Sequence, residues 1–291
     1  MAQELISTTI KPPSRVGNFV TSFLANRGAA VGAAVLAFTI FVAVLAPWIA
    51  PFTPFHLADE PFLAPGAANH ILGTDALGRD TLSQMLYGAR ISLLVGFVAA
   101  TVSLILGIII GATAGYCGGA VDSFLMRVTE AFQVLPNFIV ALVVVAMLGS
   151  GIGKLVLVIG LLAWPSTARL VRGQFLSLRS LEFVEASRTL GVPGHRIMLG
   201  EILPNALAPA IVVASLDVAR AILLEAGLSF LGLGDPDVMS WGTMLQNADR
   251  FLATAWWLSV FPGLAIFLVV LALNLVGDGL TDAVNPRLRK R

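Results

Sequence analysis

Charge is scarce in this sequence of 291 residues. Lys, Arg, Asp and Glu together make up 12% of it, whereas 57% of the residues are hydrophobic. A soluble domain carries about 25% charged residues. Because so few charges cannot cover a soluble core this apolar, the composition excludes an ordinary soluble enzyme, and also a disordered or coiled-coil protein. The net charge of +1 provides no basic field for nucleic acid.

Cysteine and histidine are nearly absent as well. The single cysteine, Cys117, excludes a disulfide within the chain, and we expect it to be a small packing residue. The three histidines, His56, His70 and His195, lie far apart in sequence and show no metal-ligand spacing. We therefore expect neither a metal site nor a cofactor in this chain.

Long stretches without any charge indicate a membrane protein. Four of them, at 28–58, 91–121, 131–153 and 251–277, exceed the roughly 20 residues that cross a bilayer as a helix. Two further apolar segments contain a few charges. The runs lack the alternation of a membrane barrel. The sequence therefore predicts an all-α fold, a polytopic membrane bundle of six helices near 28–50, 91–115, 126–150, 155–176, 206–232 and 256–280.

The distribution of Lys and Arg predicts the orientation. With both termini in the cytoplasm, thirteen of these residues fall on the inner side and four on the outer side, as the positive-inside rule requires. The first span is too long for a signal peptide and reads as a retained helix. The expected order is an inner tail (1–27), the first span (28–50), an external loop (51–90), a five-helix core (91–282) with an inner loop (177–205), and a basic inner tail (283–291).

The inner loop carries a regular pattern over residues 182–204. Apolar residues at helical spacing predict a short helix that stops at Gly191, since glycine adopts the left-handed conformation that ends helices. Pro193 suits the first turn of a second short helix, which we expect to end at Leu203-Pro204, before the fifth span. The segment is either an interfacial linker or a helix–turn–helix for a partner.

Three ionisable residues, Asp217, Arg220 and Glu225, fall inside the fifth span. Such groups are costly at membrane depth and usually face the bundle or a water-filled path. Asp217 and Arg220 are three residues apart, so they share a helix face and can pair. They either line or gate a path, or form a structural pair. Gly107, Gly111 and Gly115 recur every four residues, which favours close helix packing.

The inner loop resembles the EAA loop of ABC-importer permeases. The resemblance lies in Glu185-Ala186-Ser187, Gly191 and Ile202-Leu203-Pro204, with Ser187 in place of the second alanine of the family pattern. The resemblance implies that this loop couples the chain to cytoplasmic ATPase subunits. Glu185 would give the loop a charged anchor, Ala186 and Ser187 would allow close approach, and Gly191 would make the turn.

Other segments are similar to the dipeptide, oligopeptide and nickel importer permeases, and to their C-type subunit in particular. The similar segments are Gly73-Thr74-Asp75, Gly78-Arg79-Asp80, Ser83, Gly88-Ala89-Arg90, Ser92-Leu93, 225–234, Ser240-Trp241-Gly242, 274–280, Asp282 and Asn285-Pro286-Arg287. The chain has Thr281 and Asn285 where the family usually has Arg and Asp. These departures put an ion pair at the inner end of the sixth span in doubt. The resemblance covers about residues 25–290.

The resemblance implies a MetI-like permease fold with an additional N-terminal helix, in a bacterial cytoplasmic membrane. It implies a second, homologous permease subunit, two ATPase subunits that hold ATP and Mg, and an extracellular peptide-binding protein. The chain has no G-x-x-x-x-G-K-[ST] motif of its own. Peptides are favoured over nickel chelates as substrate. In the external segments we expect docking of the binding protein at Asp75, Arg79, Asp80, Arg90 and Trp241, or a loop whose charges pair internally.

Two other classes remain as alternatives. A self-sufficient secondary transporter or channel would use Asp217 and Glu225 as ion sites, and an inverted repeat of broken helices, which the sequence does not display, would favour it. An intramembrane enzyme would need paired carboxylates or Ser and His across spans, whereas the histidines fall in predicted loops.

Overall fold

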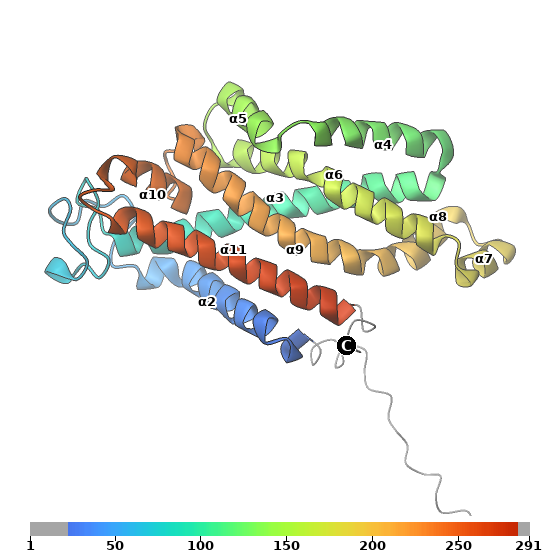
Figure 1. Ribbon diagram of the computed structural model, residues 1–291, viewed down its shortest axis with the longest axis horizontal. Coiled ribbons are helices and arrows are strands. Elements are labelled where there is room, and N and C mark those ends of the chain that lie inside the picture. The colour runs from blue at the N-terminus through green and yellow to red at the C-terminus, as the bar shows by residue number, and fades with distance from the viewer. Residues whose placement is uncertain (1–22, 285–291) are drawn as a thin grey trace, which may run out of the picture.

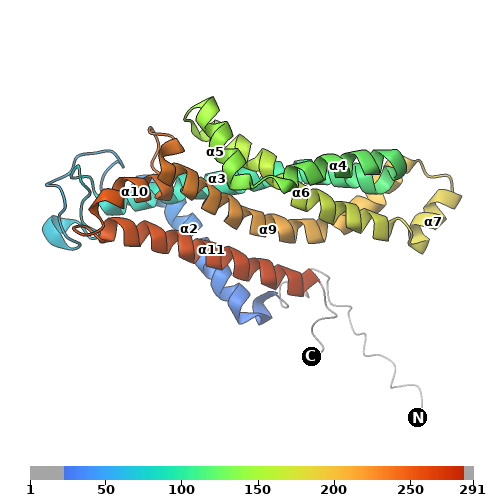
Figure 2. The same ribbon diagram turned by 45° about the horizontal axis from the view of Figure 1, so that its top comes forward.

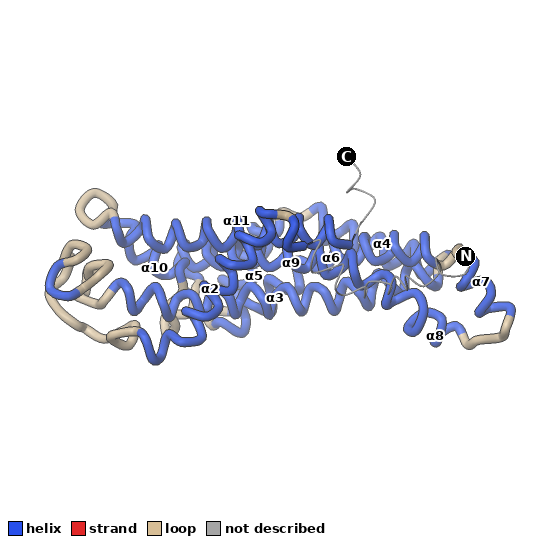
Figure 3. The backbone as a smooth tube through the Cα atoms, turned by 90° about the horizontal axis from the view of Figure 1, so that it is seen from below, coloured by secondary structure: helices blue, strands red, loops and turns tan. Residues whose placement is uncertain are grey.

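The computed structural model describes residues 23–284, and within them the chain is a bundle of long helices without strands (Figure 1). Two isolated bridges, Leu57 with Arg79 and Thr74 with Asp80, occur in the external loop. The longest loops lie at the two ends of the bundle (Figure 3). The two expected tails fall almost entirely outside the described residues.

The long helices are α2 (Arg27–Ile49), α3 (Thr81–Cys117), α6 (Ile152–Leu178), α9 (Leu203–Leu228) and α11 (Trp257–Val284). The shorter α-helices are α4 (Gly119–Val134), α5 (Asn137–Leu148), α7 (Glu182–Thr189), α8 (Gly194–Arg196) and α10 (Trp241–Ala248). Short 3₁₀ or π turns complete the order: η1 (Ala67–Asn69), η2 (Ile197–Ile202), η3 (Ser229–Leu233) and η4 (Asp249–Phe251).

Five helices are long and apolar enough to cross a membrane, and the number is six if the bent pair α4 and α5 is counted as one span. The all-α bundle is therefore confirmed, with one correction to the second span. Helix α3 begins at Thr81 rather than near residue 91, because the Asp80 side chain accepts a hydrogen bond from the Ser83 backbone N–H and caps the helix there. Helix α3 therefore already includes residues 81–90 of the expected external loop.

The expected third span, 126–150, is wrong as a single helix. Helices α4 and α5 meet at 84°, and the chain between them passes through Leu135 and Pro136 in extended conformation. Proline lacks the N–H that a helix needs and disfavours helical geometry in the residue before it. Pro165, Pro209 and Pro262, in contrast, remain inside α6, α9 and α11.

The inner loop also differs from expectation in one respect. Helix α7 ends as predicted, and Gly191 has a φ of +76°. The second short helix, however, does not end at Leu203-Pro204, because helical structure continues from Gly194 to Leu233. A π turn over Ile197–Ile202 leads directly into α9, which begins at Leu203. Pro204 stands in the first turn of α9, a position that tolerates proline.

Helices α3 and α6 form the centre of the bundle. A Cβ atom on Gly107 would lie 2.6 Å from Thr167, and one on Gly115 would lie 2.6 Å from Phe175. A Cβ atom on Gly111 would likewise clash with the Ala168 carbonyl oxygen. The three glycines therefore allow close helix packing, as predicted. Helix α2 packs against α11, on the side of the bundle opposite α4 and α5 (Figures 1 and 2).

Candidate functional site

A cavity lies where the α4–α5 bend meets α6 and α9. It has a volume of about 430 Å³, and its lining includes Gln133, Asn137, Ser166, Asp217 and Arg220 beside apolar residues of α6 and α9. Irregular backbone at membrane depth is tolerated where it is buried in protein or lines a water-filled space. The bend at Leu135 and Pro136 therefore forms part of the cavity wall, since Leu135 lines the cavity.

Asp217 and Arg220 are paired, as their spacing predicts. The Arg220 Nη1 group donates to Asp217 Oδ1 at 3.0 Å, and the Thr167 hydroxyl donates to Asp217 Oδ2 at 3.2 Å. The two side chains differ greatly in exposure, 2% for Asp217 and 65% for Arg220. The carboxylate is thus enclosed by protein, whereas the guanidinium faces the open cavity.

Glu225 has a different environment two turns further along α9. It is buried, accepts a hydrogen bond of 2.7 Å from the Ser229 hydroxyl, and lies 3.3 Å from the Ser92 hydroxyl of α3. The Ser92 hydroxyl also accepts from the Trp241 backbone N–H. Glu225 therefore joins α9, α3 and the start of α10. The structure separates it from the cavity that holds Asp217 and Arg220.

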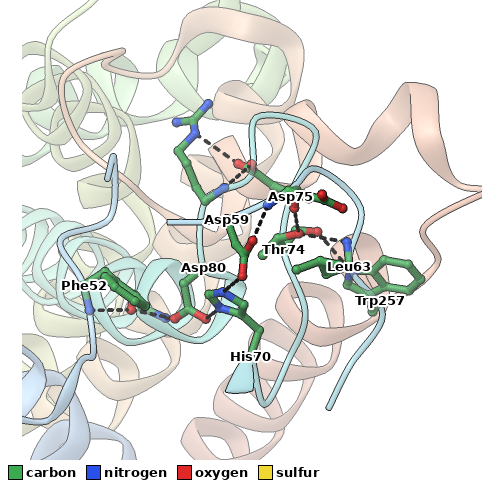
Figure 4. A network of polar contacts seen from close by, with 11 residues as sticks. Phe52, Asp59, Leu63, His70, Thr74, Asp75, Asp80 and Trp257 are labelled. Atoms are coloured by element: carbon green, nitrogen blue, oxygen red, sulfur yellow. Dashed lines mark hydrogen bonds and ion pairs between the residues drawn. The ribbon is translucent and has the colours of Figure 1, made fainter. Parts of the chain in front are cut away.

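The external loop contains a buried network of polar groups (Figure 4). His70 Nδ1 lies 2.7 Å from Asp80 Oδ1, and His70 Nε2 lies 3.7 Å from Asp59 Oδ2. The second Asp80 oxygen accepts from both the backbone and the hydroxyl of Ser83. His70 and Asp80 are only 4% and 3% exposed, so this pair fixes the loop against the start of α3. Sequence reasoning did not assign this role to His70.

Thr74 and Asp75 extend the network. Thr74 accepts a hydrogen bond from the Leu63 N–H and donates to the Glu60 carbonyl, while the Trp257 indole donates to the Thr74 carbonyl at 3.3 Å. Asp75 is buried and pairs with Arg79 Nε at 3.1 Å. The loop is therefore held at both α3 and α11 (Figure 4).

These contacts divide the five candidate docking residues. Asp75 and Asp80 are buried in the loop, and Trp241 is buried with its indole donating to the Met85 carbonyl. Arg90 is exposed, and Arg79 lies in the wall of a second cavity, of about 560 Å³, between the external loop, η3 and α10. Internal pairing of the loop, one of the two expected alternatives, is thus realised for Asp75 and Asp80.

The inner helix α7 is attached by few contacts. Val184 is fully buried, and the Ser187 hydroxyl donates to Glu201 at 2.7 Å. Glu185 pairs with Arg188 at an exposed position, and Ala186 is exposed as well. A Cβ on Gly191 would meet no atom within 4 Å, so only its positive φ demands glycine there.

The C-terminal part of the loop pattern lies inside the helix that leads into α9. Ile202 is fully buried with Val184 and Ile197, and Leu203 packs beside them. Pro204 occupies the first turn of α9. Glu201 was not identified as a candidate from the sequence, since its contact with Ser187 spans 14 residues and no local pattern marks it.

A further ion pair fastens the N-terminal end of α4 to α6. The Arg172 guanidinium of α6 donates through Nε and Nη2 to both oxygens of Asp122, and the Arg179 guanidinium binds the Gly115 carbonyl. Between the start of α2 and the end of α11, the Asn26 amide donates to Asp282 at 2.9 Å. The sequence put an ion pair at the end of the sixth span in doubt. In the structure, the amide of Asn26 contacts Asp282 in that region.

Comparison with known proteins supports the architecture over nearly the whole chain. Residues 103–290 match the family described as binding-protein-dependent transport system inner membrane component, and residues 14–65 match the N-terminal transmembrane domain of oligopeptide transport permease C. The chain is 45% identical to the dipeptide transport system permease protein DppC of Escherichia coli K12, over 96% of this chain and 95% of that protein.

Two further relatives agree. The di/tripeptide transport system permease protein DppC of Pseudomonas aeruginosa is 41% identical over 95% of this chain and 94% of its own length. The oligopeptide transport system permease protein OppC of Haemophilus influenzae is 41% identical over 92% and 87%. The chain is thus a multi-pass membrane protein and belongs to the binding-protein-dependent inner membrane transport components, among the C-type permeases of dipeptide and oligopeptide ABC transporters.

Proposed function

We propose that this chain forms half of the translocation path of an ATP-driven peptide importer. The observation that carries the proposal is its similarity, over nearly its full length, to permeases named for dipeptide, tripeptide and oligopeptide transport. A path for a peptide must be wide enough for a backbone with side chains. This bundle, with its cavity between the α4–α5 bend, α6 and α9, supplies one wall, and a second, homologous permease supplies the other.

Coupling to ATP hydrolysis is assigned to the inner loop at 182–204. Helix α7 projects beyond the other helices (Figure 1), and its charged residues Glu182, Glu185 and Arg188 are exposed. Leu190 is 83% exposed, and in this proposal the partner covers it. Val184 and the contact of Ser187 with Glu201 support the helix from behind. A cytoplasmic ATPase subunit, carrying ATP and Mg, is the proposed partner.

In this proposal both chain termini lie in the cytoplasm. The end of the bundle opposite α7 binds the extracellular peptide-binding protein. Arg90 is exposed, and Arg79 contributes to the outer cavity between the external loop and α10. In this proposal these two residues contact the binding protein. Asp75, Asp80 and Trp241 are buried. They act indirectly, because they stabilise the surface that the binding protein contacts.

Stepwise reconstitution in proteoliposomes tests the proposal. The chain alone is expected to hydrolyse no ATP and to move no labelled dipeptide. Addition of the second permease and the two ATPases should give a stable core. Addition of the peptide-loaded binding protein should then stimulate ATP hydrolysis and start uptake. ATPase rate and uptake are measured at each stage, with a binding protein of unrelated specificity as the control.

The same series distinguishes the alternative of a self-sufficient secondary transporter. Uptake by the lone chain along a proton gradient would contradict the proposal, and Asp217→Asn and Glu225→Gln would then be the first variants to test. Import of nickel chelates in place of peptides by the full assembly would retain the ABC-importer assignment and change its substrate.

A further inference from the structure

The cavity beside the α4–α5 bend offers a positive charge but no available negative charge. Both Asp217 oxygens are occupied, one by Arg220 and the other by Thr167, and the carboxylate is enclosed. Arg220 has five N–H donors and, within residues 23–284, makes a hydrogen bond with one side chain, that of Asp217. Its remaining donors are available to a ligand in the cavity.

The rest of the lining suits a small polar ligand with an apolar side chain. Gln133 and Asn137 place amide groups on the α4–α5 side, and neither amide has a hydrogen-bond partner within the described residues. Apolar residues of α6 and α9, among them Ile159, Leu162 and Leu224, form the remainder. A volume of about 430 Å³ falls within the usual range for ligand sites, about 300–1,000 Å³.

We propose that this cavity is a subsite for the C-terminal carboxylate of the peptide in transit, with Arg220 as its principal donor. Arginine binds carboxylates through two parallel hydrogen bonds. Asp217 orients the guanidinium from behind, and the amides of Gln133 and Asn137 complete the contact. Every peptide has this carboxylate, whatever its side chains, so the subsite accepts many sequences. The inference rests on the proposed peptide substrate.

The test uses the assembled core of two permeases and two ATPases in nanodiscs, without the binding protein. The probe is a dipeptide of alanine and benzoylphenylalanine with a free C-terminus, which crosslinks to nearby residues on illumination. Crosslinks are mapped by mass spectrometry and are expected at the α4–α5 bend and on α9. Unlabelled Ala-Phe should compete about tenfold better than its C-terminal amide, since a hydrogen bond to a charged group contributes enough for this factor.

Arg220→Gln should remove the difference between acid and amide, and Arg220→Lys should retain part of it. Arg127→Gln is the matched control, because it removes an exposed arginine of α4 away from the cavity lining. The Arg220→Gln variant leaves the buried Asp217 carboxylate without its charged partner. If that variant is unstable, the double variant Asp217→Asn with Arg220→Gln replaces it.

Three results would overturn the subsite: no crosslink in this cavity, equal competition by acid and amide in the wild type, or an unchanged preference in the Arg220→Gln core. If Arg220 instead pairs with an acid of the second permease, its loss should weaken the permease pair while acid and amide compete equally. Failure of the proposed function is separate, since it is measured as absent peptide uptake by the wild-type assembly with its binding protein.

Discussion

The loop before α3 and the helix α7, which lie at opposite ends of the bundle (Figure 1), treat their charged side chains differently: Asp75 and Asp80 have buried partners, whereas those of α7 face solvent. Asp75 and Asp80 are 6% and 3% exposed and have partners within the external loop. In α7 the charged residues Glu182, Glu185 and Arg188 are all exposed, and the Glu185–Arg188 pair lies at the surface. The two loops look alike in sequence, as charged stretches between spans.

The difference is one of rigidity and of accessible surface. The external loop is fixed by hydrogen bonds that reach α3 and α11 (Figure 4), so it presents a surface of defined shape. The inner helix is held mainly by one buried valine and one hydroxyl–carboxylate contact, and leaves its polar face free. Buried polar networks are costly to break, whereas exposed ion pairs contribute little. Substitutions should therefore affect the two ends differently.

The largest expected effect concerns the side of the membrane on which each end lies. In a variant with Cys117→Ser, single cysteines are placed at the exposed positions Asp237 and Arg188. A membrane-impermeant maleimide added to intact spheroplasts should label position 237 and leave position 188 unlabelled. Permeabilised cells, in which both should react, are the control. External labelling of position 188 would reverse the topology and remove the coupling role of the inner loop.

The second prediction compares the stability loss from a buried residue of the external-loop network with that from an exposed residue of the same network. Asp80→Ala removes the cap of α3 and the partner of His70 together. It should lower the free energy of unfolding by about 3 kcal/mol, from a lost cap and an unpaired buried polar group. Asp59→Ala is the control, because Asp59 is 40% exposed, and should cost less than about 1 kcal/mol.

Thermal unfolding midpoints in detergent measure this prediction, together with the rate of protease cleavage in the external loop. Equal losses in the Asp80 and Asp59 variants would mean that the loop is not held by the buried pair.

The smallest expected change in stability lies at the inner turn. Gly191→Ala should cost about 1 kcal/mol, because Gly191 has a positive φ that a Cβ disfavours. Gly200→Ala is a matched control: its added Cβ also meets no atom within 4 Å, but Gly200 lies in helical structure. There alanine should stabilise by up to about 1 kcal/mol.

Thermal midpoints should therefore move in opposite directions for the two glycine variants. Peptide uptake and ATPase association should decline for Gly191→Ala and persist for Gly200→Ala, if α7 is the docking element. A Gly191 variant with normal uptake and normal ATPase binding would refute the assigned role of the turn.

Local sequence patterns determined much of the fold. A span is recognisable because the bilayer acts on about 20 consecutive residues, so five of the six expected spans appear as single long helices. The Gly191 turn, the glycine row of α3 and the pairing of Asp217 with Arg220 depend on neighbours within one or two helical turns, or on one repeated residue type.

Tertiary structure decided which charges are buried and where the cavity lies. Ser92 meets Glu225 across 133 residues, and Thr167 meets Asp217 across 50, so no local pattern could place either carboxylate. Pro136 breaks its span while Pro165, Pro209 and Pro262 remain helical, although each is a proline in an apolar segment. Whether a proline breaks a helix depends on whether neighbouring helices satisfy the freed backbone groups, and only the packed bundle supplies those neighbours.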